Sequence, residues 1–192
     1  MTELILASGS PRRKEMLTAL GVDFEVVLPM VDETKIEGET PAKKAELAAD
    51  TKARWVAERC PHGVVIAADT IVVRTACEVL GKPQGAREAV DMLLSLSGDS
   101  HHVITGASVI SPSKHQKCVF HVSTKVVFRS LSKGEVERYV ATGEPMDKAG
   151  AYGIQGRGAL LVKRIEGCYF NVVGLPLPRL GEVLQDFGII LL

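Results

Sequence analysis

Small, hydroxylic and cationic residues gather near the start of the chain, in the run Ser8-Gly9-Ser10-Pro11-Arg12-Arg13-Lys14. The apolar residues 4–7 predict a short buried strand, and Ser10 followed by Pro11 predicts the beginning of a helix. The three cations of the run then fall in a first helical turn, where the helix dipole disfavours each exposed cation by about 0.3–1 kcal/mol. Small residues, free amides and cations on a strand-to-helix turn suit a phosphate group. A solvated basic helix start is the alternative, and this run alone does not decide between the two.

Asp69 interrupts the most apolar stretch of the chain, residues 63–73. This stretch predicts a central strand, where an unpaired carboxylate costs roughly several kcal/mol. Asp69 is therefore expected where the strand reaches a cleft, placed to hold a divalent cation, orient a water or accept its proton. Capping of a neighbouring turn is its alternative role. Glu33, in the polar loop 31–39, is by default a solvated acid and gains a role only as a second carboxylate for the same metal.

Lysines and one glutamine extend the set of groups that could bind a ligand. Lys52 and Lys82 are ordinary lysines by themselves, although the glycine and proline that flank Lys82 hold its backbone on both sides. Lys148 and Gln155 stand in the glycine-rich segment 147–156, where the backbone can approach a ligand closely. Together these groups suit cleavage of a phosphoanhydride in a nucleotide. The cations would bind phosphate, the acids would hold a metal and a water, and the amide would bind a polar ligand.

Composition and missing motifs exclude several other classes. The 23 basic and 23 acidic residues give zero net charge, and aromatic residues make up only 5%, so a nucleic acid polymer is not an expected partner. Neither a membrane span nor a leader peptide is predicted. The four cysteines lack C-x-x-C spacing, which predicts reduced thiols and a cytoplasmic protein. Motifs of P-loop proteins, dinucleotide-binding folds and serine hydrolases are absent from the sequence.

The elements that would position these residues alternate between strands and helices without a strict βαβ rhythm, which predicts a mixed sheet in one domain over residues 1–192. Strands are expected at 4–7, 24–28, 63–73, 77–80, 103–110, 118–128 and 159–165, and helices at 11–20, 41–58, 86–96, 133–140 and 178–187. In the helix 41–58, the stripe of residues expected to face the core is Leu47, Ala48, Thr51, Trp55 and Val56. Lys52 lies next to this stripe.

Five motifs stand in order along the chain. They are Leu6-Ala7-Ser8-Gly9-Ser10-Pro11-Arg12-Arg13, Ala68-Asp69-Thr70-Ile71-Val72, Gly81-Lys82-Pro83, Asp147-Lys148-Ala149-Gly150-Ala151-Tyr152-Gly153-Ile154-Gln155-Gly156 and Val172-Val173-Gly174-Leu175-Pro176. Through them essentially the whole chain resembles the Maf family of nucleoside triphosphate pyrophosphatases. The resemblance implies an α/β fold with a mixed central sheet flanked by helices, and two lobes with a deep cleft, like the inosine triphosphatase group. It also implies a divalent metal cation, Mg²⁺ or Mn²⁺, as cofactor.

The resemblance also implies roles for individual residues. Asp69 would accept the proton of the attacking water, and Glu33 would join it at the metal. Phosphate-binding cations would be Arg13, Lys52 and Lys82. Nucleotide preference would depend on Arg12, Thr70 and Gln155. The full set of expected substrate-binding residues is Ser8, Arg12, Arg13, Lys52, Thr70, Lys82 and Gln155.

The residues 147–148 and 152–155 resemble the subgroup that acts on dTTP and UTP. The amide of Gln155 suits this substrate, because it can both donate to and accept from the O4/N3–H edge of uracil or thymine. Hydrolysis of dTTP, UTP or modified pyrimidine nucleotides to the monophosphate and pyrophosphate is therefore expected. The alternatives are the same chemistry on a methylated purine triphosphate, or a nucleotide sensor that regulates cell division and septum formation. A homodimer is suggested by the family alone.

Overall fold

The structure, a computed structural model, describes residues 3–75 and 78–191. Among these residues, seven strands form one sheet in the order β2-β1-β3-β5-β6-β7, with β4 paired to β3. Strand β1 is parallel to β2 and β3, whereas β4 is antiparallel to β3 and β7 is antiparallel to β6. The mixed sheet predicted from the sequence is confirmed. The strands are β1 Leu4–Leu6, β2 Glu25–Val26, β3 Val64–Thr75, β4 Glu78–Leu80, β5 Ser100–Ser111, β6 Gln116–Phe128 and β7 Val162–Glu166.

Helices flank the strands, and short 3₁₀ turns occupy many of the connections. The α-helices are α1 Pro11–Ala19, α2 Pro41–Ala57, α3 Ala86–Leu96, α4 Lys133–Val140, α5 Tyr169–Val173 and α6 Leu177–Asp186. The 3₁₀ turns are η1 Glu33–Lys35, η2 Pro112–Lys114, η3 Glu144–Asp147, η4 Ala149–Ala151 and η5 Gly156–Leu161. Across residues 3–75 and 78–191, no helix combines the length and apolar character needed to span a membrane.

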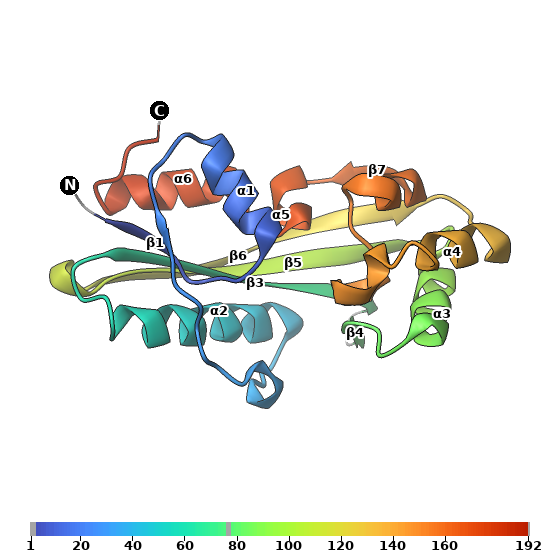
Figure 1. Ribbon diagram of the computed structural model, residues 1–192, viewed down its shortest axis with the longest axis horizontal. Coiled ribbons are helices and arrows are strands. Elements are labelled where there is room, and N and C mark those ends of the chain that lie inside the picture. The colour runs from blue at the N-terminus through green and yellow to red at the C-terminus, as the bar shows by residue number, and fades with distance from the viewer. Residues whose placement is uncertain (1–2, 76–77, 192) are drawn as a thin grey trace. The chain divides into compact units, whose positions relative to one another are not determined.

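The first of two compact units comprises Met1–Asp69, Thr105–Val122 and Gly174–Leu192. Within it, α2 lies along one face of the strands, and α1 and α6 lie on the other (Figure 1). A core cluster joins β1, β3, β5 and α2 through Ile5, Ala7, Ala53, Val56, Ala57, Val65, Ala67 and Ile110. Burying these apolar side chains is the main force that holds α2 on the sheet.

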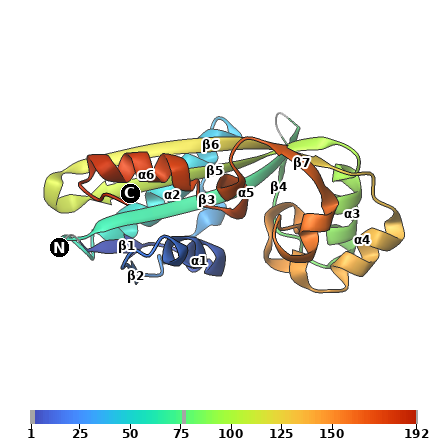
Figure 2. The same ribbon diagram turned by 90° about the horizontal axis from the view of Figure 1, so that it is seen from above.

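The second unit comprises Thr70–Ile104 and Ser123–Val173. Here α3 packs beside α4, as Figure 2 also shows. Its core contains three rings packed edge to face, with the Phe128 and Tyr152 centroids 4.8 Å apart and His101 against both. The His101 Nε2 lies 2.6 Å from the Tyr152 hydroxyl oxygen, so these two buried atoms form a hydrogen bond with each other.

Several predicted boundaries are wrong. The segment predicted as a strand at 159–165 begins with the 3₁₀ turn η5, and β7 starts only at Val162. Helix α5 and the turn η1 were not predicted, because each is about one or two turns long and too short to show an apolar period. The predicted strand at 77–80 is confirmed as β4 from Glu78, while Cys77 lies outside the described residues.

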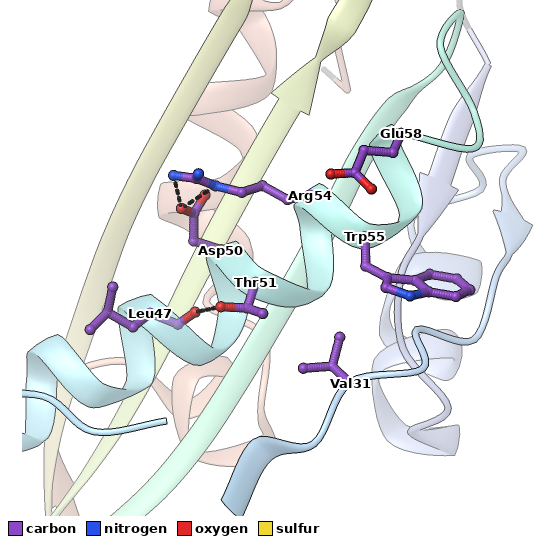
Figure 3. A pocket seen from close by; sticks show the side chains of 7 residues that line it. All are labelled: Val31, Leu47, Asp50, Thr51, Arg54, Trp55 and Glu58. Atoms are coloured by element: carbon purple, nitrogen blue, oxygen red, sulfur yellow. Dashed lines mark hydrogen bonds and ion pairs between the residues drawn. The ribbon is translucent and has the colours of Figure 1, made fainter. Parts of the chain in front are cut away.

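Only part of the stripe predicted for helix α2 faces the core: Ala48 and Val56 are buried as predicted, whereas Thr51 is exposed and Leu47 and Trp55 are only partly buried. The buried residues of this helix are Ala45, Ala48, Ala49, Asp50, Lys52, Ala53, Val56 and Ala57. Leu47, Thr51 and Trp55 instead line a hollow of about 460 Å³ on the outer side of the helix (Figure 3). A Cβ atom on Gly106 of β5 would lie 2.3 Å from the carbonyl carbon of Ala45, so helix and strand pack backbone to backbone. Only small side chains fit such a contact, and this close approach buries Lys52.

Candidate active site

Asp69 ends the first of the three chain segments that make up the first unit, and it sits in the middle of β3. Its Oδ1 accepts a hydrogen bond from the Lys52 Nζ at 2.8 Å. Burial by itself would raise the pKa of Asp69, but the charge and hydrogen bond of Lys52 and the charge of Arg13 outweigh it and hold this pKa below its usual value. The carboxylate is therefore ionised at neutral pH.

Lys52 is the deepest charged residue of the site, with 5% of its surface exposed. Its ammonium also lies 3.3 Å from the Glu33 Oε2, whose side chain is half exposed on η1. One buried cation thus stands between two carboxylates. Desolvation offsets most of the Coulombic gain of a buried ion pair, so stability alone gives little reason to place a lysine there.

Arg13, in the first turn of α1, is fixed by two hydrogen bonds. Its Nε donates to the Gly174 carbonyl at 2.8 Å, and its Nη1 donates to the Ser8 Oγ at 3.2 Å. Burial lowers the pKa of Arg13, and the charges of Asp69 and Glu33 act in the opposite direction. The Arg13 guanidinium therefore interacts electrostatically with both carboxylates, Asp69 and Glu33.

The Ser8 Oγ also accepts a hydrogen bond from the Ser10 amide at 3.2 Å, so Ser8 links the strand-to-helix turn to Arg13.

Gly174 was given no role by sequence reasoning. The signal was present in the motif 172–176, but the motif does not show that the glycine carbonyl holds Arg13. A φ of 128° at Gly174 explains the residue type at this position.

The structure therefore brings together five residues of the expected site, namely Ser8, Arg13, Glu33, Lys52 and Asp69. Arg12 is half-buried beside Arg13, and its charge helps to lower the pKa of Arg13. The residue types suggested a shared site, but the specific choice of Lys52 and Glu33 depended on the resemblance, since neither carries a distinctive sequence signal.

Thr70, Lys82 and Gln155 belong to the second unit. Lys82 is exposed in the loop after β4, and Gln155 is exposed directly before η5. Within this unit the Gly150 amide donates to the Gly81 carbonyl at 3.0 Å, which joins the glycine-rich segment to the loop of Lys82. The substrate-binding roles of these three residues remain predictions.

Lys148, the other expected ligand contact of the glycine-rich segment, is engaged inside the unit. Its Nζ donates to the Glu144 carbonyl and to the Asp147 carboxylate, both at 2.6 Å. Its contact with a ligand therefore also remains a prediction.

The hollows along α2 are not lined by any residue of the expected site. The larger, shown in Figure 3, and a second of about 360 Å³ share Leu47, Asp50 and Arg54. The Asp50 carboxylate accepts hydrogen bonds from Arg54, Lys117 and the Ser108 hydroxyl. Burial would raise the pKa of Asp50, but its two cationic partners lower it overall, so this acid is a paired anchor between α2 and the sheet.

A divalent cation is compatible with the donors beside Lys52. Asp69 and Glu33 supply hard carboxylate oxygens of the kind that Mg²⁺ and Mn²⁺ prefer. In the described part of the chain, no group of three or more acidic, histidine or cysteine side chains could hold a metal by itself. Mg²⁺ commonly uses one or two carboxylates and takes its other oxygens from water and substrate phosphates, so two acids fit a metal that arrives with a nucleotide.

Residues 3–187 match the family described as Maf-like protein. The chain belongs to the Maf family. Similar relatives include a protein named dTTP/UTP pyrophosphatase from Pelotomaculum thermopropionicum, 50% identical over 188 residues and 98% of each chain. A protein of the same name from Geobacillus sp. strain WCH70 is 52% identical over 98% of this chain and all of its own.

The Maf chain also shares its fold with a solved HAM1 protein from Coxiella burnetii, with a TM-score of 0.50 over 97% of this chain and 100% of the other. Sequence identity is only 16%, so this similarity concerns the fold alone. The α/β architecture that the sequence resemblance implied is thereby confirmed.

Proposed function

We propose that this chain hydrolyses dTTP and UTP to the nucleoside monophosphate and pyrophosphate. The observation that carries the proposal is the Asp69 carboxylate, kept ionised by the buried Lys52 in the field of Arg13. Relatives named dTTP/UTP pyrophosphatase, about half identical over nearly the full chain, support the choice of substrate.

Asp69 is proposed to orient a water and accept its proton. The water oxygen attacks the α-phosphorus, the bond from this phosphorus to the bridging oxygen breaks, and pyrophosphate leaves with the electron pair. A carboxylate of low pKa is a weak base, so its main contribution is to hold the water in line with the breaking bond. Phosphoryl transfer depends mostly on such positioning and on charge neutralisation.

Arg13 and Lys52 are proposed to bind the phosphates. Arg13 is oriented by the Gly174 carbonyl and Ser8, which leaves it little rotamer freedom to lose when a ligand binds. The amides of the turn before α1 add dipoles of the same sign. We also propose phosphate binding by Lys82, and base preference set by Arg12, Thr70 and Gln155, as the resemblance implies.

Glu33 and Asp69 are the residues proposed to hold a divalent cation. When bound, such a cation would neutralise the charge that develops on the phosphate oxygens. Both carboxylates also pair with Lys52, so a phosphate oxygen that took the place of one of them at this ammonium would leave that carboxylate available to hold the cation.

The substitution Asp69→Asn tests the proposal. It keeps the shape of the side chain but removes its charge, so kcat for dTTP and UTP should fall by about 10²–10⁴-fold. Nucleotide affinity, measured by calorimetry, should change little because the cations remain. Asp23→Asn, at an exposed acid of the same unit, serves as the control and should keep full turnover. Full turnover in Asp69→Asn, or orthophosphate as the first product of the natural chain, would contradict the proposal.

A further inference from the structure

The segment that presents Gln155 is held in place by two side chains outside it, Glu144 and Tyr139. Gln155 is exposed, and its backbone is extended with φ −94° and ψ 170°, directly before the 3₁₀ turn η5. An exposed amide on a mobile turn would recognise a base poorly, because its ordering would oppose binding. What fixes this backbone therefore bears on recognition.

Glu144, the first residue of η3, supplies most of that support. Its Oε2 accepts from the Arg157 amide at 3.1 Å, and its Oε1 accepts from the Gly158 amide at 3.0 Å. These are the second and third amides after Gln155. Hydrogen bonds from backbone amides to an ionised carboxylate are stronger than bonds between neutral groups.

Tyr139 extends the support to the other side of Gln155. Its hydroxyl donates to the Glu144 Oε1 at 2.9 Å and accepts from the Gly153 amide at 3.4 Å. The backbone is thus bound both before and after Gln155 by one hydrogen-bonded pair of side chains.

The glycines of the segment fit closely around this pair. A Cβ on Gly156, whose φ is +64°, would lie 3.0 Å from the Glu144 Oε2. A Cβ on Gly158 would lie 2.7 Å from the Tyr139 hydroxyl and 2.1 Å from the Gly153 carbonyl oxygen. Side chains at these two positions would push the carboxylate and the phenol away from the amides they bind.

We infer that Glu144 is a positioning residue for Gln155 and thereby a determinant of selectivity for the uracil or thymine edge. This inference rests on the proposed function, in which Gln155 reads the base. Glu144 itself needs no contact with the nucleotide, because its carboxylate is already occupied by the backbone of the segment.

The experiment compares Glu144→Gln with the natural chain on UTP and GTP. The variant replaces one acceptor oxygen with an NH₂ group, which faces an amide donor and cannot accept from it. The ratio of kcat/KM for UTP to that for GTP should fall about tenfold, chiefly through KM for UTP. Glu137→Gln removes an exposed charge on α4 and should leave the ratio unchanged. An equal loss for both nucleotides in Glu144→Gln would overturn the inference.

A double substitution separates positioning from general stabilisation. In a Gln155→Ala background, Glu144→Gln should change the UTP-to-GTP ratio less than twofold, because the group that it positions is gone. A full tenfold change in that background would overturn the inference. If Glu144→Gln fails to fold, Tyr139→Phe takes its place, with a fall of about twofold to fivefold in the same ratio.

Hydrogen exchange distinguishes failure of this inference from failure of the proposed function. In Glu144→Gln the amides of Arg157 and Gly158 should exchange at least tenfold faster than in the natural chain. Unchanged exchange overturns the inference even if the chain hydrolyses UTP. Faster exchange in a chain that hydrolyses no nucleotide overturns the role in selectivity together with the proposed function.

Discussion

At the scale of single residues, Lys52 has the largest influence in keeping the Asp69 carboxylate ionised. It pairs with Asp69 at 2.8 Å and with Glu33 at 3.3 Å while almost fully buried. Without this ammonium, only the charge of Arg13 and a hydrogen bond with Glu33 would oppose the effect of burial, which raises the pKa of Asp69. The proton affinity of the proposed water-orienting group is therefore set by a neighbour on another element.

Lys52→Met should shift the acidic limb of the pH profile. In the natural chain the pKa of Asp69 lies below its usual value, so kcat/KM should stay flat as the pH falls from 7 towards 5. Removing the cation raises this pKa, so protonation and loss of activity begin about 1–3 pH units higher. A plot of kcat/KM for UTP against pH measures the shift.

The control is Lys43→Met, at an exposed lysine of the same helix that pairs only weakly with Glu46. It should retain the natural profile. A lower but parallel profile in Lys52→Met would show that Lys52 does not govern the ionisation of the catalytic acid.

Asp69 could be predicted from the sequence because a carboxylate in an apolar strand is unusual by itself. Lys52 could not, since it looks like any lysine on a helix until the partner 17 positions away is placed beside it. Gly174 is a similar case, because its part in the site is played by a backbone carbonyl, which residue type does not encode.

At the scale of elements, α2 is the support of the site. Its alanines let the helix approach β5 at Gly106, and this contact rotates Lys52 inward. The apolar period of the sequence predicted the burial of Ala48 and Val56 correctly. It also placed Leu47 and Trp55 in the core, because it weights bulky residues. The deciding contact joins residues far apart in the chain, so no local pattern contains it.

Gly106→Ala should therefore weaken both stability and activity. The new Cβ would meet the backbone of Ala45 at 2.3 Å, and a helix backbone cannot yield without moving the whole element. A loss of about 1–3 kcal/mol in the free energy of unfolding is expected, as for other overpacked sites. Urea denaturation measures it, and kcat/KM should fall because Lys52 moves with α2.

Gly81→Ala is the matched control, because a Cβ there has open space and the backbone is not in the left-handed region that favours glycine. It should change stability by less than about 0.5 kcal/mol. Equal stability of the two variants would mean that α2 does not rest on Gly106.

At the scale of the whole molecule, the alternation of strands and helices was sufficient to predict a mixed α/β sheet. The order β2-β1-β3-β5-β6-β7 was not predictable, since strand pairing between distant segments depends on long-range packing. Motif order along the chain was informative about family, and the match over residues 3–187 confirms it.

A panel of nucleotides tests the proposed substrate class. UTP and dTTP should show kcat/KM at least about tenfold above that of 7-methyl-GTP, a preference that a single well-placed amide such as Gln155 can supply. A chain that prefers the methylated purine would support the alternative substrate and contradict the proposed one. Steady-state assays of released pyrophosphate give the comparison.

Hydrolysis of UTP in ¹⁸O-labelled water tests most directly whether the Asp69-bound water attacks the α-phosphorus. Mass spectrometry of the products should find one labelled oxygen in UMP and none in pyrophosphate, and Asp69→Asn should slow the appearance of labelled UMP by about 10²–10⁴-fold. Label in pyrophosphate, or in orthophosphate released with UDP, would place the attack on a different phosphorus and contradict the account.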